Sequence, residues 1–342
     1  MATQANPLTN TYIPVGPGQA SLEFEELRDE IEELTPTETP FYSNARKGTI
    51  RSLQPEWGTV NLDPNGTLAP AVAEKRGFEA TMMPAVVPER LANAAELVAE
   101  TGSVADSYDA IDLAGREDES DWQALLKGQL VRLKLDKLLF ANQAATYVEP
   151  YTMATFPAWV GGERFQSVAT TPGTPATGDG TDVYVPGTGV GAFDSIDPVD
   201  DVMEACYKTN GQPKVMYMHP SIARQWSKIP DASVAENRVN VTLGTPKEFA
   251  FYGSVGLYLS DFGLLERIIE RQADPSYMAM VDPEYFEIAT LPGRAFKKTP
   301  LAKTGSSTKF MIEWEGTTRV WNPTAHGMVE FGVASPPPPP GP

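Results

Sequence analysis

Apolar residues recur at helical spacing near the start of the chain, in a segment that is otherwise acidic. Eight acidic residues lie between Glu23 and Glu38. The pattern predicts an amphipathic helix with a narrow apolar seam made of Phe24, Leu27, Ile31 and Leu34. Pro36 and Pro40 should end this helix, because proline fixes its own backbone and restricts the residue before it. The polar segment ahead of the helix is predicted to be an extended arm.

The next segment has strand-like pieces at Thr49–Leu53 and Trp57–Leu62, separated by prolines and turn residues. Its apolar content is too low for an independent core, so residues 49–80 are predicted to form an extended hairpin that leans on another surface. Residues 91–106 fit a strand or a helix equally well.

The clearest helical pattern begins after residue 117, where Asp118 and Ser120 are candidate N-caps. Its predicted apolar face consists of Trp122, Leu125, Leu126, Leu130, Leu133, Leu138 and Leu139. An apolar face as wide as this predicts a long, buried central helix.

The composition then shifts to Gly, Thr, Pro and Ala over residues 152–194, with one strand candidate at Asp182–Val185. Helices are predicted from Asp197 and over Pro220–Ile229, and strands over Lys214–His219 and Gly256–Ser260. This order indicates a compact mixed α/β unit. After Tyr277 alternating residues indicate strands with one buried face, and the final residues SPPPPPGP form a polyproline tail.

The formal charge of the 342-residue chain is −18, which disfavours attraction to the phosphates of nucleic acid. The same charge also suits a protein that lies beside nucleic acid without adhering to it. One cysteine excludes an internal disulfide, and no apolar run approaches the roughly 20 residues of a membrane span.

The residues offer no convincing site for chemistry. His219 and Ser221 flank Pro220, and such close neighbours usually form a helix cap. His326 lies beside a turn, and the many carboxylates show no isolated pair. We therefore predict a protein without catalytic residues, cofactor or metal.

Three stretches resemble tailed-bacteriophage major head proteins with the Hong Kong 97-type fold. The first is TPTETPFYSNARKG followed by PEWGTVNLD, and the others are GQPKVMYMHPSIARQWSKI and EWEGTTRVWNPTAHGMVEFGV. They occur in the family's order from about Leu34 to Val333.

The resemblance implies an α+β capsid fold with an N-arm, an extended hairpin loop, a peripheral domain with a long spine helix, and an axial domain. The implied boundaries are 1–40 for the N-arm, 41–90 for the hairpin loop, 91–150 for the peripheral domain, 151–196 for an insertion or crossing, 197–290 for the axial domain, 291–334 for strands returning to the peripheral domain, and 335–342 for the tail.

It further implies a virion protein, made in a host cytoplasm, that assembles through pentamers and hexamers into an icosahedral shell around double-stranded DNA. Its expected partners are further copies of itself and portal, scaffold and decoration proteins, with no membrane. Two alternatives stay open: an encapsulin-like cellular compartment, and an α/β enzyme with a β-rich appendage.

We expect contacts between subunits to involve the arm, the hairpin and a basic segment that has no acid between Ile288 and Ile312. The candidate contact residues are Phe24, Leu27, Ile31, Leu34, Pro36, Pro40, Trp57, Arg294, Lys297 and Lys298. The basic residues could pair with the acidic arm of a neighbour and set register more than affinity.

Overall fold

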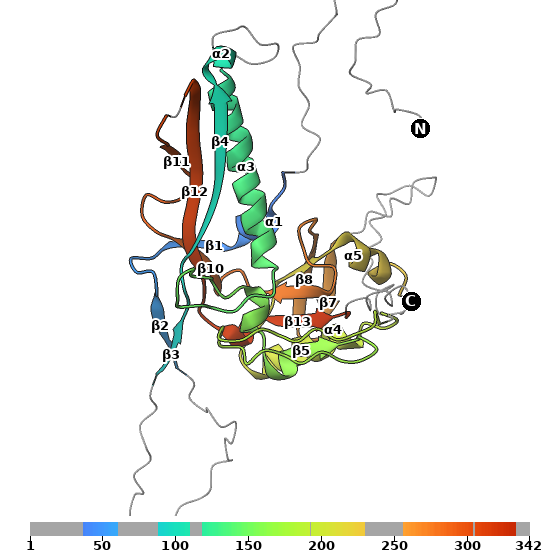
Figure 1. Cartoon of the computed structure of the whole chain (residues 1–342). Helices are drawn as coiled ribbons and strands as arrows, with labels where there is room; N and C mark the ends of the chain where they lie inside the picture. Colours follow the sequence, from blue (N-terminus) through green and yellow to red (C-terminus); the bar gives the residue numbers. More distant parts are fainter. Residues whose placement is uncertain are drawn as a thin grey trace, which may run out of the picture.

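The computed structural model describes residues 37–60, 88–109, 118–191, 193–229, 256–303 and 305–332. Several predictions lie outside these residues: the arm helix with Phe24, Leu27, Ile31 and Leu34, the proline at position 36, the hairpin beyond residue 60, and the polyproline tail. The described chain divides into a long, narrow part and a broader part, joined at one end (Figure 1).

The narrow part is a five-stranded sheet organised around the long strand β12 (Ser307–Val320). Along one side β12 pairs with β4 (Glu96–Ala105), and along the other with β10 (Phe286–Thr290) and β11 (Lys297–Pro300). β1 (Arg46–Thr49) adds a parallel strand beyond β10. The open question over residues 91–106 is resolved as strand, because this segment pairs with β12 over ten residues of β4.

Helix α3 (Glu119–Leu139) lies along this sheet (Figure 1). The predicted N-cap Asp118 is confirmed, since its carboxylate accepts hydrogen bonds from the backbone N–H groups of Ser120 and Asp121. The predicted apolar face is partly wrong, because Leu125 is 59% exposed and Leu130 is 37% exposed. The buried residues of the helix are Val131, Leu135, Asp136 and Leu139.

The broader part contains a six-stranded sheet in the order β5–β13–β9–β6–β8–β7. The strands are β5 (Phe165–Ser167), β13 (Gly327–Glu330), β9 (Tyr277–Val281), β6 (Val215–Met218), β8 (Gly263–Ile269) and β7 (Leu257–Ser260). Helices α4 (Asp197–Lys208) and α5 (Pro220–Trp226) bury their apolar sides in a second core with these strands. The predicted α/β unit is therefore confirmed, including the shared side of Ile222, Trp226 and Ile229.

A separate two-stranded sheet consists of β2 (Glu56–Thr59) and β3 (Glu89–Ala92), and it projects from the body (Figure 1). The remaining elements are short: α1 (Pro40–Asn44), α2 (Asp106–Asp109), η1 (Phe156–Trp159), η2 (Gly162–Arg164) and η3 (Pro323–Ala325). Pro40 occupies the first position of α1, where its missing N–H costs nothing.

Several predicted boundaries differ from the structure. Residues 41–50, which we placed in the hairpin loop, carry buried Phe41, Ala45 and Ile50 and belong to the body. The predicted strand Asp182–Val185 is reduced to a single bridge between Thr174 and Val185. Strand β10 lies in the sheet with β12, although we assigned residues up to 290 to the axial domain, and β13 returns to the six-stranded sheet.

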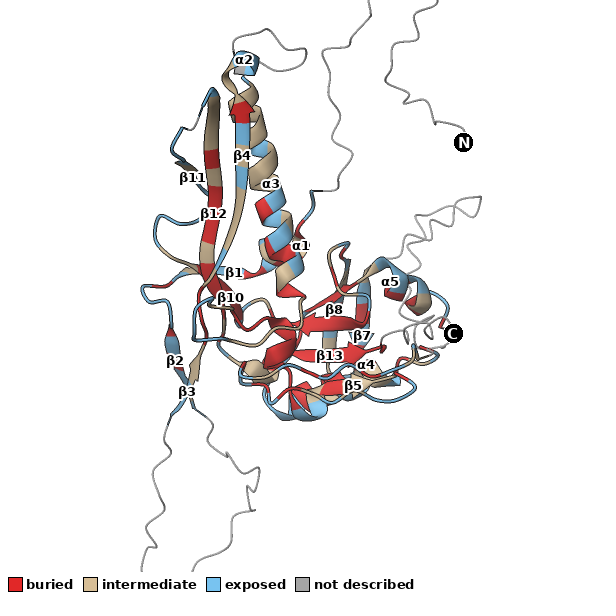
Figure 2. Cartoon of the chain, viewed as in Figure 1, coloured by how far each residue is buried: buried red, intermediate tan, exposed pale blue. Residues whose placement is uncertain are grey.

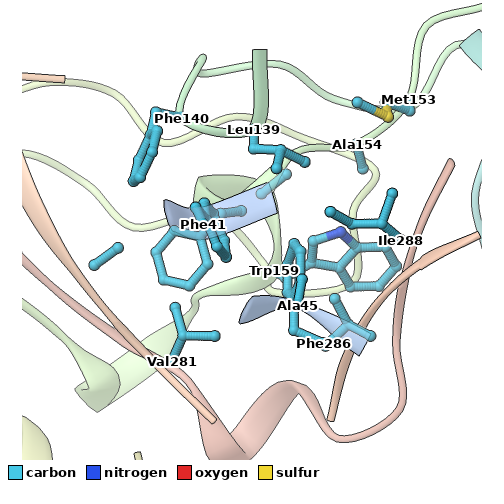
Figure 3. Close-up of a cluster of buried hydrophobic side chains, with 14 of the residues drawn as sticks. Phe41, Ala45, Leu139, Phe140, Met153, Ala154, Trp159, Val281, Phe286 and Ile288 are labelled. Atoms are coloured by element: carbon cyan, nitrogen blue, oxygen red, sulfur yellow. The ribbon is translucent and has the colours of Figure 1, made fainter. Parts of the chain in front are cut away.

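The two sheets and α3 meet around the ring of Phe41, which is 1% exposed. Its centroid lies 5.0 Å from that of Phe140, 4.7 Å from that of Tyr217 and 5.0 Å from that of Phe286. These partners follow α3, lie on β6 and lie on β10 respectively. Figure 3 shows this aromatic cluster, and Figure 2 shows buried residues concentrated where the two parts join. One side chain thus touches every major unit.

We expect Phe41→Ala to lower the free energy of unfolding of unassembled subunits by about 3–5 kcal/mol, because the truncation leaves a cavity between three elements. Denaturant unfolding measures this. Tyr108→Ala is the matched control, since Tyr108 is 55% exposed and its truncation should cost under about 0.5 kcal/mol. Equal losses of unfolding free energy for the two variants would show that Phe41 does not hold the three elements together.

Candidate functional site

The histidines are structural within the described chain. His219 is the N-cap of α5: its Nδ1 accepts from the backbone N–H of Ser221 and lies 2.7 Å from that residue's hydroxyl. His326 is fully buried, and Nδ1 accepts from the backbone N–H of Asp282. Burial lowers the pKa of His326 to about 3. Both histidines therefore act in packing and capping.

Other candidates for chemistry are equally enclosed. Cys206 is buried, and burial raises the pKa of its thiol to about 12, which makes it a poor nucleophile. Among the described residues, no three His, Cys, Asp or Glu side chains gather as a metal site would require. None of the described helices is both long and apolar enough to cross a membrane.

Trp57 fixes the base of the projecting β2–β3 sheet to the body. It is 7% exposed, its Nε1 donates a 2.8 Å hydrogen bond to the carbonyl oxygen of Val320, and its ring lies 5.7 Å from that of Trp159. The side chain is therefore an anchor within its own chain. The predicted contact of Trp57 with a neighbouring subunit stays a prediction, and the residues beside it in the ribbon, such as Glu56 and Arg90, are exposed.

The basic segment is mostly paired inside the chain. Arg294 lies 3.3 Å from Glu313 and 3.1 Å from Glu315 through its NH1 atom. Lys298 Nζ lies 2.9 Å from the Asp121 carboxylate, which places β11 beside the first turn of α3. Lys297 is exposed and has no ion pair among the described residues. The side chains of Arg294 and Lys298 are still 44% and 43% exposed, so the contact of all three basic residues with a neighbour stays a prediction.

A pair of buried carboxylates at the joint escaped the sequence analysis. Asp136 on α3 is fully buried and accepts a 2.7 Å hydrogen bond from the backbone N–H of Tyr42. Glu270, directly after β8, is 1% exposed. One oxygen of each carboxylate is buried without a hydrogen-bond partner in the described part of the chain. No sequence signal marks Asp136, whose burial depends on α1.

These surroundings favour the protonated form of the pair. Burial and, next, the charge of Glu270 raise the pKa of Asp136 to about 7, although the Tyr42 N–H, Arg132 and Lys47 oppose the shift. Burial likewise raises the pKa of Glu270. A proton on either carboxyl group would remove the repulsion across the joint.

The fold defines the class of protein. A long helix along a sheet built on one extended strand, a six-stranded sheet with two helices, and a projecting two-stranded ribbon make up the Hong Kong 97-type fold of phage capsid proteins. The chain belongs to the SU10 major capsid protein family, whose model matches residues 3–332.

Individual relatives agree with this assignment. The chain is 26% identical over 338 residues to the major capsid protein of Escherichia phage Phieco32, covering 87% of this chain and 91% of the relative. The solved capsid asymmetric unit of cyanophage A-1(L) has a TM-score of 0.62 at 10% identity, with 92% and 98% of the two chains covered. A solved chain of Mycobacterium phage Bobi matches with a TM-score of 0.58 at 14% identity, covering 93% of this chain and 97% of that one. The protein is therefore a major capsid protein of a tailed phage.

The encapsulin alternative shares only the fold. The holo-SrpI encapsulin complex of Synechococcus elongatus PCC 7942 matches with a TM-score of 0.50 at 9% identity, covering 89% of this chain and 90% of that one. Family membership and the relative of known role both favour the phage head.

The carboxylate pair makes stability depend on pH. The folded state holds its proton on Asp136 to about pH 7, whereas an unfolded aspartate loses it near about pH 4. Stability from this group is therefore full below about pH 4 and is lost as the pH rises to about 7. We expect Asp136→Asn to flatten this dependence and to raise the free energy of unfolding at pH 8 by on the order of 2 kcal/mol.

Denaturant unfolding from pH 4 to 8 measures the effect. Asp201→Asn is the control, because Asp201 is an exposed residue of α4. A slope unchanged by Asp136→Asn would show that the buried pair does not titrate in this range.

Proposed function

We propose that this chain tiles with copies of itself, through pentamers and hexamers, into an icosahedral head shell around double-stranded DNA. The β2–β3 sheet carries the proposal: it forms no backbone ladder with either other sheet and is anchored by Trp57. A two-stranded sheet alone is marginal in water, so this ribbon gains stability by resting on a neighbour. Membership of a capsid protein family supports the same conclusion.

Many such contacts would add up across a closed shell. Each is modest, and repetition by symmetry makes the sum large while single contacts can still break and re-form. We place the arm seam of Phe24, Leu27, Ile31 and Leu34, the prolines at 36 and 40, the ribbon around Trp57, and Lys297 in these contacts. Arg294 and Lys298 support Lys297 by fixing β11 against β12 and α3.

The charge of −18 suits the wall of a container for DNA, because the packaged phosphates are repelled rather than bound. DNA is then enclosed without sequence-specific contacts. Portal, scaffold and decoration proteins are the expected further partners, assembled with the shell in the host cytoplasm. The role is structural, and no catalytic step is part of it.

Expression of the full chain, alone and with a scaffold protein encoded beside it, tests the proposal. Electron microscopy should show closed shells in at least one condition. Deleting residues 1–34 should abolish shells while the subunit keeps its cooperative unfolding, because Phe41 and the joint remain. A wild-type chain that stays monomeric in both conditions and binds a small ligand would favour an enzyme.

Lys297→Glu should lower the yield of shells on the order of tenfold, as loss of one repeated ion pair of about 1.4 kcal/mol would do. Its midpoint of thermal unfolding should not change, since Lys297 has no ion pair among the described residues. Lys228→Glu, at an exposed position after α5, is the charge-matched control. A normal yield of shells for Lys297→Glu would show that Lys297 takes no part in the contact between subunits.

A further inference from the structure

Helix α3 carries a second apolar stripe that the sheet does not cover. A rotation of about 100° per residue puts the buried Val131 and Leu135 on one side and a row of leucines on the other. This outer stripe consists of Leu126, Leu130 and Leu133, and Leu125 lies about 100° round the helix from Leu126. Leu125 is 59% exposed and Leu130 is 37% exposed, while Leu126 and Leu133 are half-buried.

The stripe is unusual for a surface helix. Such helices normally present charged residues to water, and a helix that is apolar on more than one side is normally buried. Among the described elements, those packed against α3 are β4, β12, α1 and α2, and four exposed or half-exposed leucines are still left over. An apolar row of this kind marks an interaction surface.

Positive charge lies at one end of the stripe. Arg132 and Lys137 are exposed on the C-terminal half of α3. Arg132 donates to the hydroxyl of Ser43 and lies near the ring of Tyr42, which holds the guanidinium in place. At the other end Lys298 of β11 pairs with Asp121 in the first turn of α3, and Lys297, its neighbour in that strand, points to the opposite face of the sheet. The partner of the stripe should therefore be apolar along one line and acidic beside it.

The segment Glu23–Leu34 of this chain has that pattern. Its seam of four apolar residues repeats at helical spacing, and seven acids surround it against a single cation, Arg28. As a helix, Phe24 to Leu34 would span about 15 Å, enough to cover the roughly 10 Å from Leu126 to Leu133. We propose that the outer stripe of α3 is the docking site for the acidic arm segment of a neighbouring copy.

The start of the described chain lies close to α3, since α1 contacts the C-terminal half of that helix through the Tyr42–Asp136 hydrogen bond (Figure 1). Residues before proline avoid helical backbone, as Thr39 does with φ −134° and ψ 70°. Five residues can span up to about 17 Å when extended, more than the roughly 10 Å diameter of a helix, so a neighbouring copy is within reach of the seam. The mixed shells below distinguish that copy from the same molecule.

Mixed shells test this docking, which rests on the proposed assembly. One version of the full chain carries Ile31→Cys and a second carries Leu130→Cys, and the two are co-expressed. Cys206 is buried and does not compete. After electron microscopy confirms shells, a short bismaleimide linker, which tolerates a small offset in register, is added. We expect a cross-linked dimer in the mixed shells, and none in shells of either version alone.

Val148→Cys in place of Leu130→Cys is the matched control, because Val148 is 73% exposed and lies outside α3. Its cross-linked yield should be at least about tenfold lower, the ratio expected for a side chain that lies away from the partner. Shells without a dimer, or equal yields for the two positions, would overturn the docking. A third version that carries both substitutions and forms a cross-link only within one chain would overturn it as well. Absence of shells from the wild-type chain would instead contradict the proposed assembly.

A second variant avoids any dependence on linker geometry. Leu130→Gln should reduce shell yield about tenfold and leave the unfolding midpoint of free subunits unchanged. Val148→Gln, at a residue that is 73% exposed, should assemble normally. Normal assembly of Leu130→Gln would count against the stripe, and a lowered unfolding midpoint would assign Leu130 to the fold of its own subunit.

Discussion

The burial of Phe41 among rings from three elements is the constraint on which this structure depends. A single aromatic side chain, brought in from the segment ahead of the first strand, closes the space between α3, the six-stranded sheet and β10. The stretch TPTETPFYSN has a physical explanation in this position. Pro40 starts the short helix α1, Phe41 enters the core, and the arm before them departs from a fixed point.

With the parts of the subunit fixed by Phe41, the apolar side chains fall into two groups. One group is buried within the subunit, as in Phe156, Trp314 and Leu135. The other has no cover among the described residues, as in Leu125 and Leu130 on α3. Since exposed apolar area of this kind favours association, the same fold that completes one core also prepares the contacts between subunits. In the proposed docking, the acidic arm segment would make those contacts selective, because a neighbour would have to align its basic groups with these acids.

The sequence predicts those parts of the fold that depend on local chemistry. The Asp118 cap and the proline-started helix at Pro220 are local signals, and both are confirmed. Phe310, Ile312 and Trp314 are buried as their alternation predicts, but the single buried face is wrong, because Glu313 is buried as well and β9 is buried on both faces. The side of α3 that faces the sheet was not predictable, because leucines occur all round the helix. Only the positions of β4 and β12 determine which of these leucines are buried. Trp57 and Asp136 are buried by partners more than ninety positions away in the chain, and the parallel pairing of β1 with β10 is equally remote.

The central claim is that the two large sheets and α3 fold completely within one subunit. The arm segment, the β2–β3 ribbon and the outer stripe of α3 are covered only by neighbouring subunits. Hydrogen exchange of backbone amides, compared between free subunits and assembled shells, tests it most directly. The account predicts that the amides of β6, β9 and β12 are equally protected from exchange in both forms. The amides of residues 23–34, of the β2–β3 ribbon and of the outer stripe of α3 should gain protection only in shells. Full protection of these segments in the free subunit would contradict it.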